Sequence, residues 1–297
     1  MHRIMATAVV AVLLGAVVAP APAGATSPGT TVNLSTAMHD EATAYADYTA
    51  WADHATGSGY PELASLLVAT ANQERGEHFA ELASAAWLVG TNTSNVWSSM
   101  LAEYTEATNT YPRYATQATA DGDVVTSALF TELAGDEASH KSLLAQAYRY
   151  LHHMGCAPVP PLPDPVAIVE GPAQATGQTL VNVRAAMRGE AYASAKYRLY
   201  ADAAYRTGKS WLGNLFVGLS NVELYEHYAA LANRYGLVGP VATNLASAIA
   251  AEEGAIADYA SWSTSATAAG DTAEAALFTE IRGDEIGHRD AFLAMVE

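Results

Sequence analysis

The sequence contains one segment twice, at 128–140 and again at 276–288. Both copies carry Ala-Leu-Phe-Thr-Glu and then Gly-Asp-Glu-x-x-His, so Glu137 stands three residues before His140 and Glu285 three before His288. On an α-helix, positions three apart share a face. A carboxylate and an imidazole on one face can bind the same metal ion. One such pair is a weak signal, so its meaning depends on what repeats around it.

The surrounding sequence is typical of an all-helical protein. Half of the residues are apolar (51%), and long alanine-rich segments lack the short, turn-spaced runs of a sheet protein. Turn residues separate eight segments, which we expect to be helices at about 35–55, 61–89, 95–120, 124–153, 178–206, 210–235, 241–269 and 272–295. Pro112 should kink the third. Short connections between antiparallel helices favour four-helix bundles.

The order of these segments predicts two bundles in tandem. Five prolines fall within 157–165, which excludes a helix interior and predicts an extended linker. We therefore expect a ferritin-like four-helix bundle at 33–154, a Pro-rich linker at 155–176 and a second such bundle at 177–297. The Pro/Gly/Thr-rich stretch 27–31 is expected to be disordered.

The N-terminus is typical of an export signal. Arg3 precedes an apolar stretch at 8–18, and small residues follow at 21–25. The apolar stretch is too short for a membrane span. We expect a signal peptide at 1–25, its cleavage, no membrane span thereafter, and a secreted or extracytoplasmic protein.

Charge and cysteine content exclude several classes of function. The formal net charge is −17, from 31 acidic and 14 basic residues, which argues against nucleic acid as a partner. The single cysteine, Cys156, excludes an intramolecular disulfide and a four-cysteine zinc or rubredoxin-type iron site.

The two halves of the chain are related by a tandem duplication. A shift of 149 residues aligns the first half with the second as far as Glu103 and Glu252, and after one deleted residue the shift becomes 148. The glutamates also pair within each half: Glu41 lies 33 residues before Glu74, and Glu103 lies 34 before Glu137. That spacing matches the length of one long helix, a turn and part of the next antiparallel helix. The two glutamates of each pair should therefore lie side by side at the same level of a helical hairpin.

These residues match the ligand set of a dinuclear metal site in a four-helix bundle, in which two helices each give a glutamate and two give a glutamate and a histidine. In the first half the candidate ligands are Glu41, Glu74, Glu77, His78, Glu103, Glu106, Glu137 and His140. In the second half they are Glu190, Glu223, Glu226, His227, Glu252, Glu285 and His288, with Ala255 where Glu106 would be. Whether Glu74 or Glu77 is the main ligand stays open.

A bound metal would also neutralise the repulsion among glutamates gathered inside a bundle. The alternative is that these glutamates lie on solvated helix faces, as most helical glutamates do. A solvated helix face gives no reason for the glutamates to lie at one depth, to keep one spacing along the chain and to have histidines beside them. Carboxylates inside a bundle repel one another and lose hydration, so they must be protonated or neutralised by cations. Carboxylate with imidazole favours iron or manganese.

The chain resembles the rubrerythrins of the ferritin-like superfamily over both halves. Asp40-Glu41 with Tyr48, and Gly189-Glu190 with Tyr197, resemble that family's first-helix motif, and Glu103-x-x-Glu106 with Tyr111 resembles its third-helix motif. The resemblance implies a dinuclear iron centre in each bundle. It also implies that four tyrosines hydrogen-bond ligand carboxylates, namely Tyr48, Tyr111, Tyr197 and Tyr259.

The second helix of each half departs from the family pattern. Arg75 and Leu224 stand three residues before His78 and His227, where the family has a glutamate. The rubredoxin tail is also missing, which implies an external electron donor. Asp136 and Asp284 could each accept a hydrogen bond from a ligand histidine on another helix.

The resemblance implies an exported diiron oxidoreductase that reacts with peroxide or dioxygen. Two alternatives stay open: a ferroxidase or iron-binding protein without peroxidase turnover, and a metal-free helical module of the cell envelope. Manganese could replace iron, and a homodimer is compatible with the sequence.

Overall fold

The computed structural model describes residues 26–153 and 155–296, and this part of the chain is helical without strands. The signal peptide expected at 1–25 lies outside the described residues. No helix in the described part is long and apolar enough to cross a membrane. The elements are α1 (Pro28–Gly57), α2 (Pro61–Gln73), η1 (Glu74–His78), α3 (Phe79–Ala85), α4 (Asn92–Thr105), η2 (Glu106–Thr110), α5 (Tyr111–Ala120), α6 (Val124–His152), α7 (Gly177–Arg206), α8 (Ser210–Val222), η3 (Glu223–Tyr228), α9 (Ala229–Tyr235), α10 (Val241–Ala269) and α11 (Thr272–Ala294).

Eight continuous helices result, as predicted, because each η segment is a turn of π-helix inside a longer helix. The turns of α2–η1–α3, α4–η2–α5 and α8–η3–α9 therefore follow one another without a break. Pro112, expected to kink the third helix, is the second residue of α5 and lies two positions after the end of η2. A π turn beside a proline is reasonable, since the proline ring would clash with a regular α-helical turn before it.

The prediction of disorder at 27–31 is wrong. Ser27 caps α1, and its hydroxyl accepts a hydrogen bond from the Thr30 backbone N–H at 3.3 Å. The Ser27 backbone N–H in turn donates to the Asp271 carboxylate at 3.1 Å. A serine cap followed by proline in the first helical turn is a known start signal, and here it outweighs the Pro/Gly composition.

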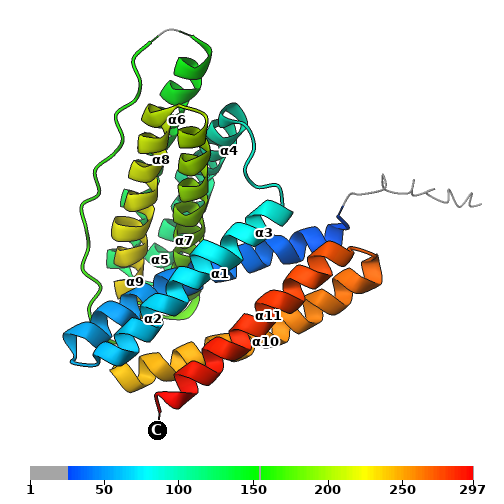
Figure 1. Cartoon of the computed structure of the whole chain (residues 1–297). Helices are drawn as coiled ribbons and strands as arrows, with labels where there is room; N and C mark the ends of the chain where they lie inside the picture. Colours follow the sequence, from blue (N-terminus) through cyan, green and yellow to red (C-terminus); the bar gives the residue numbers. More distant parts are fainter. Residues whose placement is uncertain (1–25, 154, 297) are drawn as a thin grey trace, which may run out of the picture.

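The predicted division into bundles at 33–154 and 177–297 does not match the packing of the helices. One bundle, here called the outer bundle, combines α1 and α2–η1–α3 with α10 and α11, from the two ends of the chain. The other, the inner bundle, combines α4–η2–α5 and α6 with α7 and α8–η3–α9. The inner bundle is thus inserted between the two hairpins of the outer bundle. Figure 1 shows the two groups of helices, with α1 passing between them.

The duplication explains why the sequence could not show this exchange. The two halves are homologous, so the hairpin α10–α11 presents the same residue types as the hairpin α4–α6. The first hairpin can pair with either and complete the same set of glutamates and histidines. Ligand spacing within one hairpin is identical in both arrangements, and only the packing between hairpins distinguishes them.

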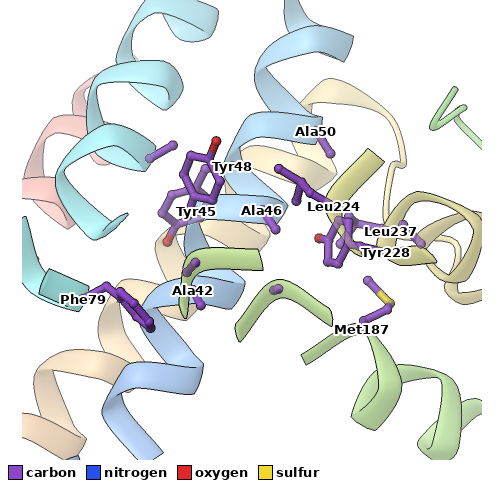
Figure 2. Packing of buried hydrophobic residues seen from close by; sticks show 14 of the residues in the cluster. Ala42, Tyr45, Ala46, Tyr48, Ala50, Phe79, Met187, Leu224, Tyr228 and Leu237 are labelled. Carbon is purple, nitrogen blue, oxygen red and sulfur yellow. The ribbon is translucent and has the colours of Figure 1, made fainter. Parts of the chain in front are cut away.

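The two bundles pack on each other through α1 and α7. Figure 2 shows the small residues Ala46 and Ala50 of α1 beside Leu224 and Tyr228 of the inner bundle. Small side chains on α1 allow close approach, and the aromatic and aliphatic side chains opposite fill the space. Tyr228 also donates a hydrogen bond to the buried carboxylate of Asp47.

The linker lies along α8–η3–α9 (Figure 1) and is fixed there by backbone hydrogen bonds. The Val166 N–H donates to the carbonyl of Tyr225, within the π turn η3, at 2.8 Å. Gly236 ends α9 with φ 72°, and a Cβ there would lie 2.3 Å from the backbone nitrogen of Ala173. Only glycine allows the linker to pass so closely.

Candidate metal centres

Each bundle contains one buried cluster of four glutamates and two histidines. The outer centre consists of Glu41, Glu74, His78, Glu252, Glu285 and His288. The inner centre consists of Glu103, Glu137, His140, Glu190, Glu223 and His227. All twelve side chains are buried, and within each group of four that the clusters contain, the candidate ligand atoms lie within 4.8 Å of one another. Each centre takes residues from both halves of the sequence.

In the outer centre, each histidine faces three carboxylates through Nδ1. His78 lies 2.9 Å from Glu74, 3.4 Å from Glu285 and 3.5 Å from Glu41. His288 lies 3.1 Å from Glu285, 3.2 Å from Glu74 and 3.7 Å from Glu252. Glu74 and Glu285 are therefore shared between the histidines, whereas Glu41 and Glu252 each serve one side.

The inner centre repeats this arrangement. His140 Nδ1 lies 3.0 Å from Glu137, 3.2 Å from Glu223 and 3.6 Å from Glu103. His227 Nδ1 lies 2.8 Å from Glu223, 3.3 Å from Glu137 and 3.5 Å from Glu190. Each histidine thus faces three carboxylates, and two of the carboxylates are shared by both histidines. This pattern matches the ligand set of dinuclear metal sites in four-helix bundles.

The π turns explain the departure on the second helix. A π turn holds one more residue than an α turn, so Glu74 and His78, four apart, meet as Glu-x-x-His does on a regular helix. Glu77 is exposed and lies outside the centre. Glu223 and His227 meet in the same way within η3. Neither Glu77 nor Glu226 was correctly predicted as a ligand, because α-helical spacing does not hold across these turns.

Glu226 has a structural contact instead. Its carboxylate accepts a hydrogen bond from the backbone N–H of Asp164 in the linker at 3.1 Å. Glu77 lies in a surface group with Glu280 and Asp284. Of the two residues left open, Glu74 therefore lies in the centre and Glu77 does not.

Glu106 lies beside the inner centre and not within its clusters of candidate ligands. It is the first residue of η2, and the equivalent helix α10 is α-helical throughout. The residue deleted from the second half falls between Glu252 and Tyr259, so the deletion removes this π turn. The two centres therefore differ by Glu106 and one π turn together.

Three of the four predicted tyrosines hydrogen-bond a ligand carboxylate, but across the exchanged hairpins. Tyr48 donates to Glu252 at 2.6 Å, Tyr259 donates to Glu41, and Tyr197 donates to Glu103. For Tyr111 the structure records no hydrogen bond to a carboxylate among the described residues. Tyr111 is buried and stacks on Phe130, since it follows the π turn that the other helices lack at this position.

Polar groups behind the histidines complete each site. His78 Nε2 lies 3.4 Å from Asp284, as expected for an aspartate on another helix, and His227 Nε2 lies 3.6 Å from Asp136. His288 Nε2 lies 3.0 Å from Gln73 Oε1, a contact that the sequence did not reveal. Gln73 directly precedes Glu74, and its repeat equivalent is Val222, so no motif marked it.

The protonation of the centres follows from burial and mutual repulsion. Burial raises the pKa of Glu252 to about 9 and that of Glu190 to about 8, although the neighbouring His288 and His227 favour the charged carboxylates. Burial works against the charge of His288, but hydrogen bonds to Glu252 and Glu285 raise its pKa to about 12. Hydrogen bonds from His288 and His78 outweigh burial at Glu285 and lower its pKa to about 2. Without a metal, protons bound to Glu190, Glu252 and His288 reduce the repulsion among the buried carboxylates.

Unpartnered polar atoms in the inner centre indicate that its residues fit a metal. Seven buried ligand atoms there have no hydrogen-bond partner: Glu103 Oε2, Glu137 Oε1, Glu190 Oε1, both carboxylate oxygens of Glu223 and both ring nitrogens of His227. Unpaired buried polar atoms are costly. Atoms that converge without bonding one another are arranged for a shared cation, and their types favour iron or manganese.

A comparison with protein families agrees with this geometry. A rubrerythrin family model matches residues 95–235, from the first turn of α4 to the last residue of α9. Over this segment, just under half of the chain and here called the rubrerythrin segment, the sequence is similar to the rubrerythrins. Rubrerythrins are a ferritin-like diiron-carboxylate family, and this match together with the buried glutamates and histidines indicates a metal site in the segment. No curated protein and no solved structure matches the chain.

The rubrerythrin segment coincides with the inner bundle and its linker. One family domain thus corresponds to the one bundle that is continuous in sequence. The outer bundle lies outside the match and is connected to it by the internal repeat.

Proposed function

We propose that this protein is an exported non-haem diiron oxidoreductase that reduces peroxide, or dioxygen, with electrons from an external donor. The observation that carries the proposal is the pair of buried four-glutamate, two-histidine centres, one of them inside a rubrerythrin segment. Reduction of peroxide to two waters consumes two electrons and two protons. A dinuclear iron centre, when bound, would supply this two-electron chemistry, and the external donor would provide the electrons.

The residues divide this work between them. In the outer centre, six residues would hold the metal, namely Glu41, Glu74, His78, Glu252, Glu285 and His288. Glu74 and Glu285 each lie within 3.4 Å of Nδ1 of both histidines. Tyr48 and Tyr259 orient the outer carboxylates by donating hydrogen bonds to Glu252 and Glu41. A carboxylate fixed in this way keeps its remaining oxygen directed at the metal.

Metal analysis and rapid mixing test the proposal. Purified protein should contain close to four iron ions per chain, and the reduced protein should be oxidised by peroxide much faster than by dioxygen. Rapid oxidation by dioxygen alone, with ferric iron accumulating, would instead indicate a ferroxidase. Less than one iron or manganese ion per chain in every preparation would contradict metal-dependent function altogether.

The proposed location outside the cytoplasm depends on the N-terminal sequence alone. N-terminal sequencing of protein recovered from the culture medium or envelope should begin near residue 26. Recovery of the intact chain from the cytoplasm would contradict export.

A further inference from the structure

A cavity of about 260 Å³ opens beside the outer centre. Its walls are formed by α1 and α10 and carry four aromatic side chains, Tyr48, Trp51, Tyr259 and Trp262. Glu41, Glu74, Glu252 and Glu285 of the outer centre also line it. The cavity thus joins an aromatic wall to the ligands of one metal centre.

The cavity exists where the second half departs from the first. Gly254 and Ala255 line it on α10, at the positions of Thr105 and Glu106 in the inner bundle. A methyl group therefore replaces a carboxylate side chain beside the centre. In the inner bundle, Glu106 fills this place, with Oε1 4.0 Å from where a Cβ on Gly189 would lie. Gly189 directly precedes the inner ligand Glu190.

The size of the cavity exceeds the needs of peroxide or dioxygen. A cavity of about 150 Å³ lined by apolar side chains is large enough for benzene. The outer cavity is larger and its wall is aromatic, so it suits a planar ring, which packs well against aromatic faces.

The charges around the cavity favour an uncharged ligand. Arg184 lines the cavity and is already paired with Asp47 at 3.0 Å. Asp40, which also lines it, is paired with Arg188 at 2.8 Å. Asp258 is a further acid in the lining. An anion would therefore meet these acidic side chains without a free cation among the cavity's lining residues.

We propose that the outer cavity binds a small uncharged organic molecule, about the size of one aromatic ring, beside the outer centre. Glu106 keeps such a ligand out of the inner centre, so the two centres of one chain differ in the ligands they admit. This inference goes beyond the proposed function, because binding requires neither an oxidant nor turnover.

Ligand-observed NMR titration of the full-length protein with phenol tests the proposal, with benzoate as the charged counterpart. Phenol should bind at one site per chain and at least tenfold more tightly than benzoate. Ala255→Leu fills the cavity and should weaken phenol binding at least tenfold. Ala257→Leu is the matched control, since it adds the same side chain to an exposed position on the same helix and should change binding less than twofold.

Glu106→Ala provides the reciprocal test, since it should open a second phenol site in the inner bundle. Absence of that site would overturn the role of Glu106. Equal binding of phenol and benzoate, unchanged binding in Ala255→Leu with folding and metal content intact, or no phenol binding by the wild type would overturn the cavity proposal. Each result is obtained without oxidant, so it is distinguishable from failure of the redox function.

Discussion

Tyr48 donates a 2.6 Å hydrogen bond to Glu252, a residue 204 positions later in the chain. The bond connects α1 to α10, two helices that are separated in sequence by the whole inner bundle. It is repeated by Tyr259, which donates to Glu41 in the opposite direction. The outer centre therefore depends on contacts between the two ends of the chain.

Tyr48→Phe should lower the metal affinity of the outer centre by about 10- to 100-fold, the usual effect of losing a group that orients a metal ligand. The inner centre should keep its affinity, since its equivalent contact is made by Tyr197. Metal competition with a chelator measures both. Tyr111→Phe is the control, because the described structure gives Tyr111 no carboxylate contact, and an equal loss there would contradict the assignment.

The contact between Asp47 and Tyr228 should contribute to the stability of the whole chain. Tyr228→Phe leaves a buried carboxylate without one of its hydrogen bonds, although Arg184 still pairs with it at 3.0 Å. We expect a loss of about 1–3 kcal/mol in the free energy of unfolding. Urea denaturation measures it, and Tyr225→Phe, at an exposed position on the same π turn, should cost less than about 0.5 kcal/mol. Equal losses in the two variants would exclude a specific role for this contact.

The metal-free protein should lose stability as pH rises from 6.5 to 9. The pKa of Glu252 rises from 4.5 to about 9 and that of Glu190 to about 8, so their protons stabilise the fold below pH 4.5 and are lost through pH 8 and 9. The contribution of His288, whose pKa rises from 6.5 to about 12, is present below pH 6.5 and declines above it. Glu285 acts oppositely, since its pKa falls to about 2 and its contribution is lost in acid.

Thermal denaturation across this range measures the effect. Bound metal should remove or reverse it, because metal ions bind the deprotonated ligands. A metal-free protein that becomes more stable between pH 6.5 and 9 would contradict the protonation described for the centres.

The helices and the ligands were largely predictable from the sequence, whereas their grouping was not. Glu41, Glu137 and His140 lie in the buried clusters as expected, because carboxylate and histidine spacing on helices is a local property. Glu77 and Glu226 were misassigned because a π turn changes which residues share a face, and the sequence carries no clear signal for it. The exchange of hairpins was missed because duplicated hairpins offer interchangeable partners.

The insertion of one bundle into the other predicts how fragments behave. Residues 92–238 contain a complete inner bundle, so this fragment should fold cooperatively and bind about half the metal of the full chain. Residues 33–154, the first bundle predicted from sequence, contain half of each centre. This fragment can complete a centre only if its two hairpins pair with each other, which they do not do in the full chain, so it should bind metal more weakly. Circular dichroism with metal analysis compares them, and the reverse ranking would contradict the exchanged arrangement.

The most direct measurement is the metal content of two double variants in the full chain. Glu41→Ala with Glu285→Ala removes two ligands of the outer centre only, so about half of the wild-type metal should remain. Glu41→Ala with Glu137→Ala removes one ligand from each centre, so both centres should lose metal. A bundle made from consecutive helices requires the opposite: half retained when Glu41 and Glu137 are changed, and both centres impaired when Glu41 and Glu285 are changed.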